Sequence, residues 1–162
     1  MLQLWDVHVA LTREVVLAAA LKTPNLNAAV AALYQNQKDL GANLAQFYGK
    51  AVGDKYAALL TIHIDLAIKI VTDVLSGLDP KCDIKAWYKN AREIACFLAK
   101  TIRFAKFEVL KELLDSHLDC TLDEATLIIQ AKYPESLVEF ATCLRRIKRL
   151  SKYLSKTILA SI

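Results

Sequence analysis

Hydrophobic residues recur every three or four positions along most of this chain, which is the spacing that gathers them on one face of an α-helix. The alternation of apolar and polar residues that is typical of strands does not occur in the sequence. The pattern predicts four long helices, over residues 2–22, 25–48, 52–76 and 81–101. Shorter helices are expected over 104–118 and 121–132, and a last helix from 134 to near the C-terminus.

Capping residues set these boundaries. Thr23–Pro24 and Asp79–Pro80 each place a capping residue before a proline, which is typical of a helix start. Gly49 and Gly77 are suited to helix ends. Thr121-x-x-Glu124 has the spacing of a capping box and predicts a new helix at Thr121. A run of polar residues at 35–37 predicts a break in the second helix.

Short connections between long helices favour antiparallel neighbours. We therefore expect an all-α fold, with residues 1–162 forming one domain: an up-and-down four-helix bundle with two or three additional short helices. No internal repeat is evident. The 55% hydrophobic content, four glycines and three prolines agree with long helices.

The mean hydropathy of +0.28 raises the question of a membrane span. No stretch of about 20 mostly apolar residues occurs, so we expect no transmembrane segment. The N-terminus lacks a secretory signal, which favours a cytoplasmic or other intracellular, reducing location. Cys82, Cys96, Cys120 and Cys143 show no paired short spacing and are interpreted as small side chains of the core, not disulfides or a zinc site.

The chain contains three histidines, and each falls on the apolar face of a predicted helix. A buried polar group needs a partner, so His8, His63 and His117 must bond to another side chain, a water or a metal. One hypothesis joins them with Glu93 or Asp39 in an interior polar site that holds a transition metal. The Glu-x-x-His motif of di-iron bundles is absent, and we favour structural hydrogen bonds, with no cofactor.

Asn90 and Glu93 lie three residues apart and share a helical face. A partly buried Glu93 would need a cation, and Arg13 of the first helix is the candidate. The three residues are expected to form a buried ion pair or polar network, since bidentate pairing with arginine keeps a carboxylate inside.

The last helix carries its basic residues at helical spacing and contains no acidic residue after Ala141. The stripe consists of Arg145, Arg149, Lys152 and Lys156. It is suited to nucleic acid, an anionic membrane surface or an acidic protein. The simpler interpretation, a solvated face whose charges complement the helix dipole, is favoured.

No catalytic motif is present: the sequence lacks a G-x-S-x-G elbow and phosphate-binding glycine loops. We therefore favour a non-enzymatic interaction or structural protein that binds a protein partner or self-associates as a homodimer. The alternatives are a metal-binding bundle protein or enzyme with the interior His/Glu site, and anionic-surface binding through the last helix.

Several segments between Trp5 and Glu124 resemble an uncharacterised family of small, mainly bacterial, all-helical bundle proteins. They are Trp5-x-x-His8-Val9-x-x-Thr12-Arg13, Asn36-Gln37-Lys38-Asp39, Phe47-Tyr48-Gly49, Leu59 with His63, Trp87-Tyr88-x-Asn90-Ala91-x-Glu93-Ile94-Ala95-x-Phe97-Leu98, and His117-Leu118-x-x-Thr121-x-x-Glu124. The resemblance implies a single helical bundle and no particular activity, cofactor or partner. The basic last helix and the lack of a proline soon after Leu98 depart from the family pattern.

Overall fold

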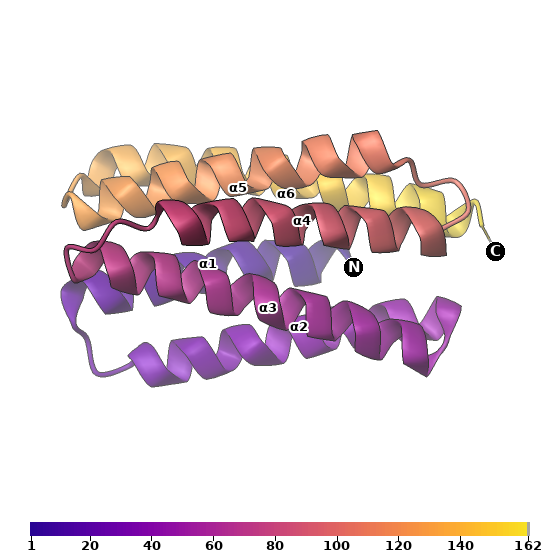
Figure 1. Cartoon of the computed structure of the whole chain (residues 1–162), viewed down its shortest axis with the longest axis horizontal. Coiled ribbons are helices and arrows are strands. Elements are labelled where there is room, and N and C mark those ends of the chain that lie inside the picture. Colours follow the sequence, from indigo (N-terminus) through magenta and orange to yellow (C-terminus); the bar gives the residue numbers. More distant parts are fainter. Residues whose placement is uncertain (162) are drawn as a thin grey trace.

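The computed structural model describes residues 1–161, with Leu2 described by its backbone alone, and this part of the chain folds into six α-helices without strands (Figure 1). The helices are α1 (Leu2–Leu21), α2 (Leu26–Tyr48), α3 (Lys50–Leu75), α4 (Lys81–Thr101), α5 (Phe107–Ile129) and α6 (Tyr133–Leu159). The prediction of an all-α fold is confirmed. The expected division into four long and two or three short helices does not hold, because all six have 20 to 27 residues.

Two predicted helix boundaries are wrong because the side chains on which they depend form other hydrogen bonds. Thr121 does not cap a new helix: its hydroxyl donates to the carbonyl of His117 (2.9 Å), inside a continuous α5. Helix α2 also runs unbroken through its polar stretch, because Asn36 and Gln37 are buried and hydrogen-bonded. Gln37 donates to the hydroxyl of Thr61 (3.0 Å) on α3.

The helices form three hairpins: α1 with α2, α3 with α4, and α5 with α6. Helices that follow one another in the chain pack together, and α6 also packs against α1, as do α3 and α5. In Figure 1 the three hairpin turns lie at one end of the molecule, and both termini lie toward the other. The first helices of the hairpins, α1, α3 and α5, therefore run in the same direction.

The three hairpins share a set of equivalent positions, although no internal repeat is evident in the sequence. His8, His63 and His117 follow one another at intervals of 55 and 54 residues, one on the first helix of each hairpin. The residue fourteen positions after each histidine has a positive φ angle. These residues are Lys22 (54°), Gly77 (75°) and Ala131 (57°). Each hairpin thus turns at the same point of the repeat, through a left-handed residue that ends its first helix.

Hydrogen bonds between hairpins repeat in the same way. The hydroxyl of Tyr34 on α2 donates to Asp65 on α3, and that of Tyr88 on α4 donates to Asp119 on α5. Both pairs are separated by 31 residues in the chain. The second helix of one hairpin is therefore attached to the first helix of the next in the same register.

Most of the core belongs to one continuous apolar cluster that includes Trp5, Leu40, Trp87 and Leu150. Helices α2 and α3 approach closely at Gly41 and Gly53, where a Cβ atom on Gly41 would lie 2.7 Å from the carbonyl oxygen of Gly53. None of the helices within residues 1–161 is long and apolar enough to cross a membrane.

Candidate functional site

The three histidines converge in the core, between the first helices of the three hairpins. Their exposed fractions are 2% for His8, 3% for His63 and 2% for His117. The ring centroids of His8 and His117 are 5.8 Å apart. His63 lies close enough that the charge of His8 influences its pKa, and both influence the pKa of His117. The repeat thus brings three imidazoles from different helices into one layer.

An asparagine on the second helix of the hairpin orients each of the first two rings. The Nδ1 atom of His8 is 3.2 Å from Oδ1 of Asn36, and that of His63 is 3.0 Å from Oδ1 of Asn90. Each asparagine donates its Nδ2 to a backbone carbonyl one turn before the histidine, at Leu4 (2.9 Å) and Leu59 (3.2 Å). The amide oxygens must therefore accept, and the proton of each ring is on Nδ1.

This tautomer leaves Nε2 of His8 and His63 as a lone-pair acceptor on the far side of the ring. Within residues 1–161 no group donates a hydrogen bond to either Nε2 atom. A ring whose Nδ1–H is held by an oxygen acceptor while Nε2 remains available is the usual arrangement of a metal-binding histidine. Trp87 supports the second ring, since its Nε1 donates to the carbonyl of His63 (2.9 Å) and its ring lies 5.1 Å from the imidazole.

The third hairpin departs from this pattern at one position. Asn36 and Asn90 lie four residues before the buried Leu40 and Ile94, and Arg146 takes the equivalent position before Leu150. Nη1 of Arg146 donates to the carbonyl of Ser116 (2.8 Å). No asparagine orients His117, whose Nδ1 is instead 3.5 Å from the hydroxyl of Thr121.

All three imidazoles are held in the neutral form. Burial lowers the pKa of His8 to about 4, against the smaller opposing effect of the bond to Asn36. Burial, with a contribution from His8, lowers the pKa of His63 to about 3. Burial also lowers the pKa of His117 well below its usual value, and the charges of the other histidines and of Arg146 act in the same direction. Neutral imidazole is the form that binds metals.

The acidic residues expected beside the histidines lie elsewhere. Glu93 is on the surface, where its side chain is 49% exposed and lies 3.9 Å from Nζ of Lys89. Asp39 is also exposed and accepts a hydrogen bond from Gln35 (2.9 Å). The interior site therefore contains histidine and asparagine, and neither carboxylate takes part in it.

Arg13 forms a buried ion pair, but with Glu124 instead of Glu93. Nη1 of Arg13 is 2.5 Å from a carboxylate oxygen of Glu124, and the two side chains are 12% and 6% exposed. Arg13 also donates to the hydroxyl of Ser136 (3.1 Å) and lies over the ring of Phe140. The pair connects α1 to α5 and α6 one to two turns beyond the histidine layer.

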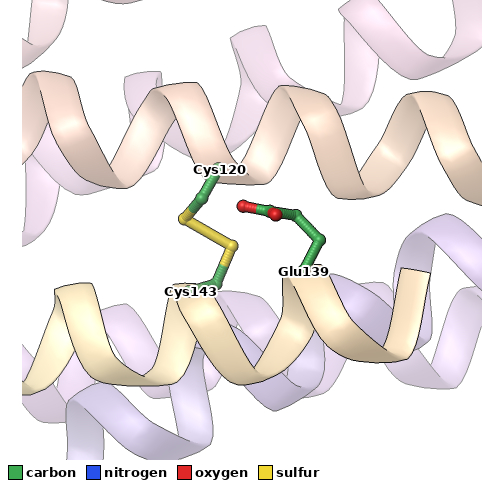
Figure 2. A group of neighbouring side chains, drawn as sticks. All are labelled: Cys120, Glu139 and Cys143. Carbon is green, nitrogen blue, oxygen red and sulfur yellow. A yellow bond between two sulfur atoms is a disulfide. The ribbon is translucent and has the colours of Figure 1, made fainter. Parts of the chain in front are cut away.

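Two of the cysteines are joined. Cys120 on α5 and Cys143 on α6 form a disulfide, while Cys82 is exposed and Cys96 half-buried. The interpretation of all four as unpaired core side chains is therefore wrong, and the disulfide does not fit the expected reducing location. Figure 2 shows the carboxylate of Glu139 beside the bridge.

Cys120, Glu139 and Cys143 place their ligand atoms within 4.8 Å of one another. In the described part of the chain, no other group of three or more His, Cys, Asp or Glu side chains does so. While the sulfurs are bonded to each other they are not thiolates, which are the form that binds metal. The three histidines do not meet this distance criterion as they stand.

The basic stripe on α6 has the exposure expected from the sequence, since Arg145, Arg149, Lys152 and Lys156 are all exposed. Among residues 1–161, no carboxylate lies within 4.0 Å of these four cations. Its role as a binding surface stays a prediction.

Comparison with known proteins gives no matching family, no matching curated protein and no matching solved structure. The resemblance to a bacterial family therefore stays a prediction. Sequence reasoning missed Asn36 and Arg146. The signal for the first was the segment Tyr34-Gln35-Asn36, which returns 54 residues later as Tyr88-Lys89-Asn90.

Proposed function

We propose that this protein binds a first-row transition metal ion at the centre formed by His8, His63 and His117. The observation that carries the proposal is their convergence as three buried, neutral imidazoles from equivalent positions of three hairpins. Three histidines are a sufficient protein ligand set for zinc, and imidazole also suits copper, iron and nickel.

The spacing of the rings is close to what one ion needs. Imidazoles bound at metal–nitrogen distances of about 2.0–2.1 Å have ring centroids roughly 5 Å apart. The centroids of His8 and His117 are 5.8 Å apart, so the two rings would have to move closer together for both Nε2 atoms to reach one ion. His63 has to approach with them for all three Nε2 atoms to reach the ion.

The hydrogen bonds to Asn36 and Asn90 support this role, because they fix which nitrogen carries the proton without charging the ring. Removing such a partner typically lowers metal affinity 10–100-fold. With three protein ligands, a fourth position on the ion is open to a water or a small molecule.

Titration of the metal-free protein with Co²⁺, followed by visible absorption, tests the proposal. We expect saturation at one ion per chain with a spectrum of nitrogen and oxygen ligands, and loss of saturation in His8→Gln, His63→Gln and His117→Gln. The matched control is the double variant Cys120→Ser/Cys143→Ser, which should bind as the wild type does. Binding that disappears in the cysteine variant, or no binding by folded wild-type protein, would refute the histidine centre.

A second candidate function is self-association at the end that bears the hairpin turns. Three strongly exposed apolar side chains belong to the hairpin turns and to the start of the helix that follows: Leu78 (61%) lies in the α3–α4 connection, and Leu137 (57%) and Val138 (69%) lie in the first two turns of α6. Exposed apolar groups gathered in one region are typical of interaction surfaces. Light scattering after size exclusion should detect a dimer that Val138→Glu converts to monomer, and a strict monomer at micromolar concentration would end this candidate.

A further inference from the structure

A small cavity lies beside the histidine layer, between the same three helices. Its volume is about 30 Å³. The residues one turn and two turns after each histidine line it, from equivalent positions of the three hairpins: Thr12, Ala67 and Thr121, then Val16, Val71 and Ala125. Because the first helices of the hairpins run in the same direction, the cavity and the histidines lie one above the other between these helices.

The distance between the two is short. Four residues of helix advance about 6 Å along the axis, so the nearer wall of the cavity is one turn from the histidines. Trp87 belongs to both places, since its indole lines the cavity and lies 5.1 Å from the ring of His63. A molecule in the cavity would therefore be a near neighbour of an ion held by the histidines.

The walls of the cavity offer no free hydrogen-bonding group to a bound molecule. The other lining residues are valine, leucine, isoleucine and alanine, and the two threonines use their hydroxyls elsewhere. Thr12 donates to the carbonyl of His8 (2.8 Å) and Thr121 to that of His117 (2.9 Å). A buried water needs two to four polar partners, and an apolar cavity without them stays dry and accepts uncharged guests.

The size of the cavity limits the guest. A single water needs about 10–15 Å³ of such volume, so the volume of this cavity corresponds to a molecule of about two heavy atoms. An ion would lose its hydration without gaining a partner here, which excludes charged molecules.

We propose that this cavity is a binding site for an uncharged diatomic gas, with dioxygen as the case to test. The inference deepens the proposed function, because it names the class of small molecule that would reach the open position of a bound metal. The occupancy of the cavity itself depends on its walls and does not require the ion.

Dioxygen is paramagnetic, so it accelerates the nuclear relaxation of the atoms it contacts. The test is the relaxation of methyl protons in metal-free protein under dioxygen pressure, compared with nitrogen at the same pressure. We expect enhancement several-fold larger at the methyls of Val16 and Val71 than at those of Leu40, which is fully buried away from the cavity.

Ala125→Leu fills the cavity and should remove the excess at Val16 and Val71. The matched control is Ala58→Leu on an exposed position of α3, which should keep it. Ala67→Val is a smaller filling variant to use if Ala125→Leu fails to fold. Equal enhancement at all buried methyls, or an excess that survives filling, would overturn the inference.

The two proposals fail separately. Metal binding without a dioxygen signal would remove the gas site and leave the histidine centre. A dioxygen signal without metal binding would support the cavity site and refute the proposed metal centre beside it.

Discussion

Acid should destabilise this protein at a higher pH than carboxylate titration explains, because the folded state keeps three histidines neutral. In the unfolded chain a histidine has a pKa near 6.5, whereas burial lowers the pKa of His8 to about 4 and that of His63 to about 3. The unfolded state therefore binds more protons between these values. The stabilisation is complete above pH 6.5 and is lost as the pH falls toward the folded pKa.

The magnitude follows from proton linkage. Each such histidine lowers the free energy of unfolding by about 1.4 kcal/mol per pH unit within this window. Between pH 7 and pH 5 the loss is about 2 kcal/mol for each of His8 and His63, or about 4 kcal/mol for the two, and His117 adds to the loss in the same direction. Small domains have total stabilities of about 5–15 kcal/mol, so a large part of the stability is lost by pH 5.

Urea unfolding of the metal-free protein at pH 7, 6 and 5 measures this loss, with the fluorescence of Trp5 and Trp87 as the signal. Both indoles lie beside a histidine ring, at 5.4 Å from His8 and 5.1 Å from His63. His63→Gln should lose about 2 kcal/mol less than the wild type over this range.

Asp39→Asn is the control, because it changes an exposed side chain outside the histidine layer and should leave the loss unchanged. The reasoning is refuted if the wild type and His63→Gln lose the same free energy between pH 7 and pH 5.

Three further predictions concern the rest of the fold. Thiol titration of the unfolded, unreduced protein should find two reactive thiols instead of four. The variant Cys120→Ala/Cys143→Ala should have a free energy of unfolding lower by about 3 kcal/mol, because the disulfide closes a loop across the α5–α6 turn. Arg13→Met leaves the carboxylate of Glu124 buried without its partner and should lower the free energy of unfolding in urea by about 3–5 kcal/mol. The double variant Arg13→Met/Glu124→Leu should recover much of this free energy, and no recovery would contradict the assigned ion pair. Gly41→Ala should lower the melting temperature although alanine favours helix, because the new Cβ would lie 2.7 Å from a backbone oxygen of α3; an unchanged or higher value would show that the two helices can separate without loss.

The sequence predicts the helices better than it predicts their ends. Apolar periodicity survives in the structure because burying one face of a helix is what stabilises it. Capping signals are local and fail where a tertiary partner competes for the same side chain. Thr121 has the right type and spacing for a cap, yet its hydroxyl serves the carbonyl of His117 and Glu124 pairs with Arg13.

The histidines illustrate what can and cannot be predicted about the site. Their position on apolar faces predicts burial, which the structure shows, but not which polar groups face them. Glu93 and Asp39 are the acidic residues expected beside the histidines, whereas the structure places the amides of Asn36 and Asn90 there. The neutral amide oxygen of an asparagine accepts the Nδ1 proton of a neutral ring without bringing a charge into the core. A carboxylate in the same place would be a buried charge, which is costly.

The repetition among the hairpins is hard to detect in the sequence because they share few residue types. Tyr34-Gln35-Asn36 and Tyr88-Lys89-Asn90 share two of three residues, and in the third hairpin Arg146 replaces the asparagine. Core positions tolerate exchange among apolar residues, so repeated units keep their geometry after their sequences diverge. The intervals of 55 and 54 residues between the three histidines are the clearest trace of the pattern in the sequence.

The measurement that tests the central claim most directly is the metal content of protein purified without a histidine tag or chelator, by elemental analysis. The comparison is between the wild type, His63→Gln and Cys120→Ser/Cys143→Ser. The account predicts close to one transition-metal ion per chain in the wild type and the cysteine variant, and none in His63→Gln. A folded wild type that contains no metal and takes up none would contradict it, as would metal that remains in His63→Gln.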